Sequence, residues 1–182
     1  MSNLSRQQLY RLDESAIEEL LERYRTPLLY FIMSFLGEFP DAEDVVSETI
    51  VKLLVKKPLL RNENALKTYL YTTAKHFAID RLRKRKKERQ YLEDAARLAK
   101  TDIDYIDENM GDTEEKRRLA AALRTLPSQY RQVLHLSFFE ELPVSEICKI
   151  LGKSKKQIYN LLARAKATLS EKLKKEDTQD EI

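Results

Sequence analysis

The sequence predicts an all-α protein made of two small helical domains that are joined by an acidic linker. Its 182 residues include only three Gly and five Pro, so helix-breaking positions are rare. Apolar residues recur at intervals of three and four along most of the chain, which is the spacing of amphipathic helices. The alternating runs of β-branched residues that a sheet needs are few.

The charged residues, which make up 35% of the chain, are segregated along the sequence. Residues 75–91 contain eight Lys or Arg and two acids, a net charge of +6. Residues 149–175 contain nine Lys or Arg and one acid, a net charge of +8. Between them, residues 93–115 contain nine acids and two basic residues, a net charge of −7. This asymmetry favours a polyanionic partner, although a charge run by itself is most often a solvated helix face.

Length and composition also limit how many domains the chain can form and indicate its cellular compartment. A chain of 182 residues can form one medium domain or two small ones. It has a single cysteine, Cys148, and it lacks an apolar leader and any apolar run long enough to span a bilayer. We therefore expect a soluble protein of a reducing compartment, the cytoplasm by default, without membrane insertion.

The N-terminal half begins with two helical segments. Leu4–Leu36 has apolar residues at helical spacing and is closed by Gly37 and Pro40, which predicts one or two amphipathic helices. Asp41–Val55 predicts a short helix with one apolar face. Carboxylates are favourable at the positive end of a helix dipole, and this segment begins with Asp41, Glu43 and Asp44.

A loop and a longer helix follow. Pro58 and two Asn residues predict a loop over Lys56–Asn64. From Leu66 an apolar stripe continues helically into the first basic block, as far as Arg89.

The domain boundaries follow from the acidic stretch. Residues 92–112 have little continuous apolar patterning, so we predict a flexible linker there. The predicted domains are residues 1–91 and 113–176, followed by a disordered tail, residues 177–182. Helical spacing in Glu114–Lys175 predicts three or four short helices.

The residues around Gly152 predict a helix-turn-helix. Pro143 suits the first turn of a helix, and Gly152 supplies the backbone freedom that a tight turn requires. Ser154 and Gln157 match a capping box, in which each side chain bonds the backbone N–H of the other residue. A second helix is therefore expected to begin at about Lys155. Its outer side is formed by Lys155, Lys156, Tyr159, Asn160 and Ala163.

This second helix has the character of a recognition helix in the major groove of DNA. Lys and Asn near its start can reach base edges, whereas Arg164 and Lys166 would lie near phosphates. An ordinary helical hairpin with a solvated basic face would carry the same local pattern about as often. The density of basic residues on a helix that follows such a turn favours DNA binding.

The motifs in both halves resemble those of a known family. Leu126 and Pro127, followed by RQVLHLSFFEELPVSEICKILGKSKKQIYNLLARAKATL, resemble the promoter-binding region four of sigma-70 family initiation factors. The helix by which these factors hold the clamp of the RNA polymerase β′ subunit is similar to DAEDVVSETIVKLL. The promoter-melting segment that follows it looks like TYLYTTAKHFAIDRLRKRKK. Two such halves, joined by a short linker, are similar to the extracytoplasmic-function (ECF) group.

The resemblance implies a sigma factor that binds core polymerase, recognises two promoter elements and supports transcription initiation. The implied partners are the polymerase β′ clamp and β flap, promoter DNA and an anti-sigma factor, with no cofactor and no metal. Core-polymerase contacts are implied at Asp41, Glu43, Asp44 and Glu48. Contacts with the proximal promoter element are implied at Arg61, Asn62, Asn64, Tyr69, Tyr71, Lys75, His76, Arg81, Arg83 and Lys84. Contacts with the distal element are implied at Ser154, Lys155, Lys156, Tyr159, Asn160, Arg164 and Lys166.

Two other function classes compete with this interpretation. A helix-turn-helix regulator that does not replace a sigma factor would explain the C-terminal half equally well, but it gives no reason for a second basic block in the N-terminal half. An enzyme is disfavoured, because His76 and His135 have no metal-like spacing and three Gly residues cannot form a Gly-rich phosphate loop. The carboxylates at the start of Asp41–Val55 point in different directions on a helix, which disfavours a divalent-ion site.

Overall fold

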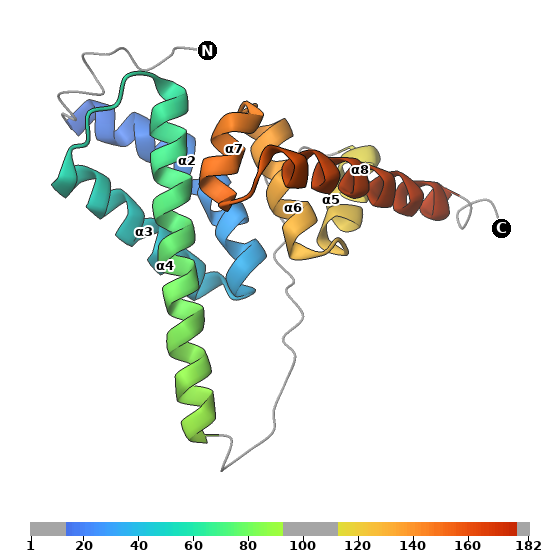
Figure 1. Ribbon diagram of the computed structural model, residues 1–182, viewed down its shortest axis with the longest axis horizontal. Helices are drawn as coiled ribbons and strands as arrows, with labels where there is room; N and C mark the ends of the chain where they lie inside the picture. Colours follow the sequence, from blue (N-terminus) through green and yellow to red (C-terminus); the bar gives the residue numbers. More distant parts are fainter. Residues whose placement is uncertain (1–13, 93–112, 178–182) are drawn as a thin grey trace. The chain divides into compact units, whose positions relative to one another are not determined.

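The computed structural model describes residues 14–92 and 113–177, and every element within these ranges is helical (Figure 1). In chain order the elements are α2 (Glu14–Leu36), α3 (Phe39–Lys56), α4 (Glu63–Leu92), α5 (Glu114–Arg124), α6 (Ser128–Leu134), the π-helix η1 (His135–Phe139), α7 (Val144–Leu151) and α8 (Lys155–Asp177). The predicted all-α fold class is confirmed.

Contacts divide the chain into two compact units, Met1–Ile103 and Asp104–Ile182. The division falls within residues 92–112, the predicted acidic linker, of which residues 93–112 lie outside the described ranges. The beginning of the predicted segment Leu4–Leu36 and nearly all of the predicted tail also lie outside them.

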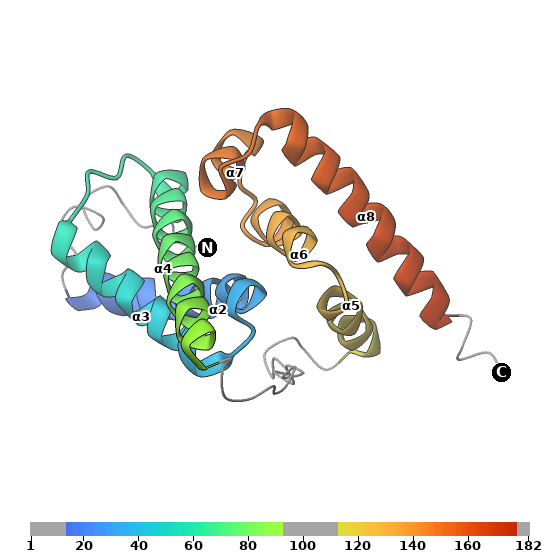
Figure 2. The same ribbon diagram turned by 60° about the horizontal axis from the view of Figure 1, so that its bottom comes forward.

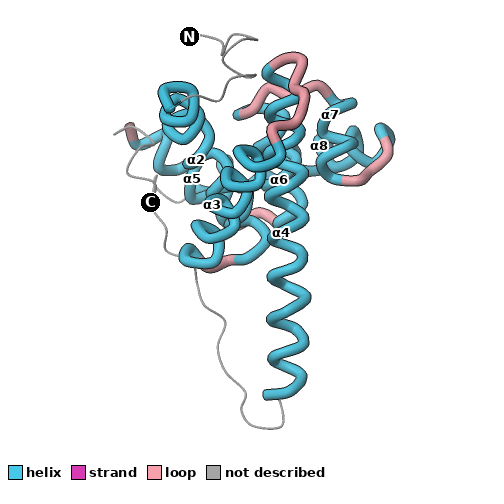
Figure 3. The backbone as a smooth tube through the Cα atoms, turned by 90° about the vertical axis from the view of Figure 1, so that its left-hand side faces the viewer, coloured by secondary structure: helices cyan, strands magenta, loops and turns pink. Residues whose placement is uncertain are grey.

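The described part of the first unit, residues 14–92, is a three-helix bundle in which α2, α3 and α4 each pack against the other two. The apolar faces meet in a core whose buried side chains each stabilise the fold by about 1.5–3 kcal/mol. Its largest fully buried members are Leu20, Tyr24, Leu28, Phe31, Ile32, Leu53, Leu66, Leu70 and Tyr71. The C-terminal part of α4 extends beyond the other two helices of this unit (Figure 3).

The ends of α2 and α3 are set by local backbone chemistry. α2 ends at Leu36, and Gly37 follows with φ of 76°, a left-handed conformation that residues with a Cβ avoid. α3 has Pro40 in its first turn, where a missing N–H costs nothing. At its C-terminal end Lys57 has φ of 42°, and its N–H donates to the Leu53 carbonyl at 2.9 Å. These local signals set where α3 begins and ends, and its charged first turns lie against α4 in the packed bundle.

The second unit is arranged along α8, which packs against α5, α6 and α7 (Figure 2). α6 passes directly into η1, and a short connection leads to α7. Burial of Arg131 on α6 lowers the pKa of its guanidinium, and its Nη1 donates to the Arg124 carbonyl at the end of α5, at 2.9 Å. Among the described residues of this unit, the buried apolar side chains are Ala122, Leu126, Val133, Leu134, Leu136, Leu142, Ile147, Ile150, Leu151, Ile158 and Ala165.

The predicted helix-turn-helix is formed by α7, the turn at Gly152 and α8. Gly152 has φ of 67° and ψ of 38°, the left-handed conformation expected of it. The Ser154 N–H donates to Gln157 Oε1 at 2.8 Å, and the Gln157 N–H donates to Ser154 Oγ at 3.3 Å. Both bonds of the predicted capping box are therefore present, and α8 begins at Lys155 as expected. Pro143 lies one residue before α7 rather than inside its first turn.

Candidate functional site

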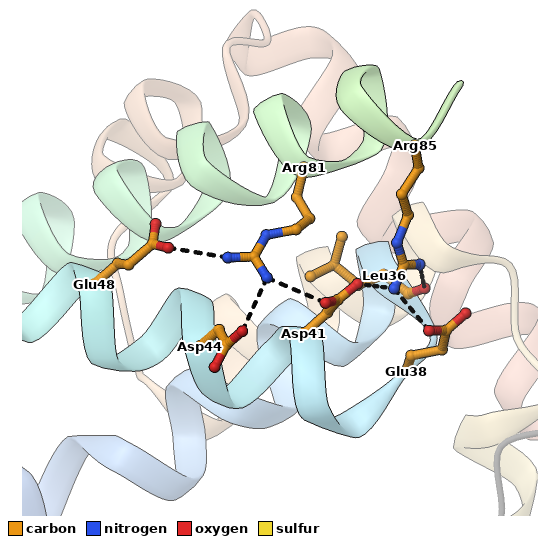
Figure 4. Close-up of polar contacts among 7 residues, drawn as sticks. All are labelled: Leu36, Glu38, Asp41, Asp44, Glu48, Arg81 and Arg85. Atoms are coloured by element: carbon orange, nitrogen blue, oxygen red, sulfur yellow. Dashed lines mark hydrogen bonds and ion pairs between the residues drawn. The ribbon is translucent and has the colours of Figure 1, made fainter. Parts of the chain in front are cut away.

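Six charged side chains join α3 to α4 in the first unit, and we call them the arginine–acid cluster: Glu38, Asp41, Asp44, Glu48, Arg81 and Arg85 (Figure 4). Arg81 lies at its centre. Arg81 Nη1 donates to Asp41 Oδ1 and to Asp44 Oδ2, both at 3.1 Å, and Nη2 donates to Glu48 Oε1 at 2.9 Å. One guanidinium on α4 thus pairs with carboxylates from three successive turns of α3.

Arg85, one turn further along α4, pairs with the beginning of α3. Its Nη2 donates to Glu38 Oε2 at 2.7 Å and forms an ion pair with Asp41 Oδ2. Its Nη1 lies 3.5 Å from the Leu36 carbonyl at the C-terminal end of α2, where a cation is favoured by the helix dipole. Arg85 therefore ties all three helices of the bundle together.

The four acids predicted to contact polymerase do not present one common surface. Asp41 is only 23% exposed and has both carboxylate oxygens engaged, one by Arg81 and one by Arg85. Glu43 pairs with Arg25 of α2 at 2.6 Å. The Asp44 and Glu48 side chains are 66% and 50% exposed. Only these last two combine high exposure with a position on the outer side of the cluster.

Two predicted promoter contacts need correction. Tyr71 is fully buried, and its ring packs edge-on against Phe31 with centroids 5.0 Å apart. Its helical position explains this, because Tyr71 lies on the same face of α4 as the buried Ala74 and Ala78. Arg81, predicted to lie along the promoter backbone, instead directs its guanidinium at α3. The apolar stripe of α4 could have identified Tyr71 as a buried residue. The ion pairs of Arg81 could not be predicted in this way, because its partners are distant in the sequence.

The other predicted residues of α4 lie closer to solvent. His76, Arg83 and Lys84 are exposed, and Tyr69 and Lys75 are partly exposed. Arg83 Nη1 donates to Asp80 Oδ1, also exposed, at 3.4 Å. Exposed charge pairs of this kind contribute at most about 1 kcal/mol, so Asp80 can release Arg83 to a phosphate at little cost.

The start of α4 is held by Asn62, which the sequence singled out, and by Glu63, which it did not. Arg61, Asn62 and Asn64 are exposed, and the Asn62 side chain accepts the Ala65 N–H at 2.9 Å, as a helix cap does. Glu63 accepts hydrogen bonds from Arg23 Nη2 at 2.6 Å and from the Tyr24 hydroxyl at 3.0 Å. These bonds anchor the start of α4 to α2.

In the second unit the predicted outer side of α8 is exposed: Lys155, Lys156, Tyr159, Asn160, Arg164 and Lys166. Ser154 is also exposed, but its hydroxyl serves the capping box. Lys166 Nζ lies 4.8 Å from the ring centroid of Phe138, a cation–π contact. The exposed side of α8 and the beginning of α6 border a depression of about 220 Å³ that is lined by Gln129, Lys153, Gln157, Asn160, Leu161 and Arg164.

The described parts of the chain contain no group of three or more His, Cys, Asp or Glu placed to hold a metal ion. Among the helices of residues 14–92 and 113–177, none is both long and apolar enough to cross a membrane.

Two family models match the chain, one in each unit. Residues 20–88, in the bundle of α2, α3 and α4, match Sigma-70 region 2, and residues 116–169, in α5 to α8, match Sigma-70 region 4. RNA polymerase sigma factor SigV of Bacillus subtilis (strain 168) is 33% identical over 144 residues, which cover 79% of this chain and 82% of that protein. The chain belongs to the sigma-70 family of RNA polymerase sigma factors. This confirms the resemblance seen in the sequence.

Similar members of the sigma-70 family refine this placement. RNA polymerase sigma factor YlaC of the same organism is 29% identical over 169 residues, covering 92% of this chain and 97% of that protein. A solved structure of the sigma factor RpoE in complex with the anti-sigma factor NepR from Bartonella quintana matches with a TM-score of 0.66 and 25% identity, covering 86% of this chain and 95% of that one. Together with the similar ECF sigma factor SigW of B. subtilis, 23% identical over 177 residues, these relatives place the chain in the ECF group.

Proposed function

We propose that this ECF sigma factor binds core RNA polymerase through α3, engages the melted proximal promoter element through α4 and reads the distal element through α8. Sigma factors are transcription initiation factors rather than enzymes. The observation that carries the proposal is that regions 2 and 4 of the family fall in separate units, each with its own exposed basic surface.

The polymerase-docking face is formed by one side of α3. Asp44, Glu48, Val51 and Val55 follow one another at intervals of four, three and four, which places them on one helix face. The two acids are half-exposed or more, and Val51 and Val55 are 58% and 74% exposed. Acids beside exposed apolar side chains suit a protein partner with a basic and apolar surface, which supports the β′ clamp in that role.

The proximal promoter element would meet one side of α4. Tyr69, His76 and Arg83 are seven residues apart, so they share a face, and Lys84 lies beside them. An aromatic ring can stack on an unpaired base, and cations can neutralise the backbone of a single strand. Arg61 and Asn64, next to the anchored start of α4, extend this surface toward the loop.

The distal element would be read as duplex DNA by the start of α8. Lys155, Lys156, Tyr159 and Asn160 project from its first two turns, as in a helix-turn-helix whose second helix enters the major groove. Arg164 lies one turn further, where a phosphate contact is expected. The depression that Arg164 helps to line adds Gln129 and Lys153 to the same surface.

An anti-sigma factor is a further proposed partner. The similar solved structure contains the sigma factor RpoE in complex with the anti-sigma factor NepR, and the match covers 95% of that chain. The test is a competition assay. Each protein encoded by a gene next to the gene for this chain is purified, and we measure whether it blocks binding of the chain to core polymerase. Failure of every such candidate to compete would remove this partner from the proposal.

Reconstituted transcription tests the proposed function. Purified core polymerase without a sigma factor is mixed with the full chain and a pool of promoter templates, and transcript 5′ ends are sequenced. We expect discrete start sites that share two upstream elements. A helix-turn-helix regulator would start no RNA from this enzyme, so the absence of specific starts across the pool would contradict the proposal. A variant with Asp44→Lys and Glu48→Lys is the matched inactive control.

A further inference from the structure

Three acids of the arginine–acid cluster would repel one another without Arg81. Asp41, Asp44 and Glu48 are spaced by three and four residues, so their side chains lie along one stripe of α3. The Arg81 guanidinium contacts all three at 2.9–3.1 Å. Because the guanidinium is planar and presents its donors in a fixed fork, these contacts also define the orientation of each carboxylate.

Arg81 leaves part of this acidic surface open. It bonds one oxygen of Asp44, Oδ2, and one oxygen of Glu48, Oε1, whereas a carboxylate can accept bonds at both oxygens. Both side chains remain half-exposed or more. The cluster has four acids and two arginines, so it keeps a net charge of −2. A cationic partner can therefore approach Asp44 and Glu48 without displacing Arg81.

We propose that Arg81 is a positioning residue for polymerase binding: it holds the Asp44 and Glu48 carboxylates so that their second oxygens face a cationic partner. This inference rests on the proposed docking face of α3. Side chains that are ordered before binding lose less conformational freedom when a complex forms. Arg81 thus acts on polymerase affinity from α4, the helix whose other side is proposed to face DNA.

Arg85 offers a matched comparison. It lies on the same helix and pairs with the same partner helix, and its side chain is 21% exposed against 25% for Arg81. Its partners are Glu38, Asp41 and the Leu36 carbonyl, and neither Asp44 nor Glu48 is among the contacts it makes in Figure 4. Arg85 is therefore expected to support the packing of the bundle without positioning the docking acids.

The test measures the affinity of full-length variants for core polymerase together with their thermal unfolding midpoints. Arg81→Gln is expected to weaken binding about tenfold, because the Asp44 and Glu48 side chains lose their preorganisation. Arg85→Gln is expected to lower the midpoint while its affinity at a temperature where it is folded stays within about twofold of wild type. Arg81→Lys should recover only part of the affinity, because an ammonium ion is a compact charge without the fork.

A double variant separates this inference from the proposed function. In an Asp44→Asn, Glu48→Gln background, Arg81→Gln should cause no further loss, because the groups that it positions are no longer charged. If that background binds polymerase like wild type, the docking face itself is wrong. If the background loses affinity, the positioning role is overturned by any of three results for Arg81→Gln alone: unchanged affinity, tighter binding, or a loss equal to that of Arg85→Gln.

Discussion

Ser154 and Gln157 cap α8 reciprocally, with hydrogen bonds of 2.8 Å and 3.3 Å between the backbone of each and the side chain of the other. The pair fixes where the helix begins and hence which residues of its first two turns project outward. Lys155, Lys156 and Tyr159 are therefore placed by a local interaction at the turn.

Removing this cap should destabilise the second unit. Ser154→Ala is expected to cost about 1 kcal/mol of unfolding free energy, because one N–H at the helix start loses its acceptor. Chemical denaturation followed by circular dichroism measures the loss. Ser170→Ala, at an exposed position inside α8, is the control and should be nearly neutral. Equal stability of the two variants would show that the capping box contributes nothing.

Neutralising the start of α8 should weaken recognition of the distal promoter element. Lys155→Gln plus Lys156→Gln is expected to reduce the affinity of the holoenzyme for upstream duplex by about 1–3 kcal/mol if these side chains touch base edges. Fluorescence anisotropy on a labelled duplex at constant salt provides the measurement. Lys174→Gln, near the other end of the same helix, serves as the control for general charge loss. Unchanged affinity in the double variant would remove α8 as the recognition helix.

Charge reversal on the outer side of α3 should abolish polymerase binding. Asp44→Lys plus Glu48→Lys places two cations where a cationic partner is expected, and like charges across an interface cost several kcal/mol. Co-purification with core polymerase is the measurement, and far-ultraviolet circular dichroism reports whether the helices persist. The control is Glu18→Lys plus Glu22→Lys, which makes the same charge change at exposed positions of α2. If the first variant still co-purifies, α3 is not the docking helix.

Two tyrosines of α4 should behave differently. Tyr71→Ala removes a fully buried ring and is expected to cost about 3–5 kcal/mol of stability. Tyr69→Ala should cost less stability, because its side chain is partly exposed, but it should weaken binding of the holoenzyme to the melted element by about 1–3 kcal/mol if the ring stacks on a base. Denaturation and binding to a single-stranded probe separate the two effects. A DNA-binding defect in folded Tyr71→Phe together with none in Tyr69→Ala would reverse the assignment.

Much of the local structure could be predicted from the sequence. The end of α2 at Gly37, the turn at Gly152, the start of α8 and its exposed side follow from residues within a few positions of one another. Helix capping, glycine conformations and apolar periodicity are short-range effects, and the sequence displays them directly. The family motifs in the two halves likewise identified a sigma factor before any contact was known.

Which charged residues face outward was decided by the tertiary structure. Arg81 and Asp41 are 40 residues apart, and Glu43 and Arg25 are 18 apart, so no periodicity in either helix reveals these partners. The sequence determined that α3 carries acids and α4 carries cations. Packing the two helices together decided that Arg81 pairs with α3, that Asp41 is mostly buried, and that the Asp44 and Glu48 side chains stay half-exposed or more. The physical reason is that an ion pair forms wherever the folded backbone brings opposite charges within about 4 Å, whatever their separation along the chain.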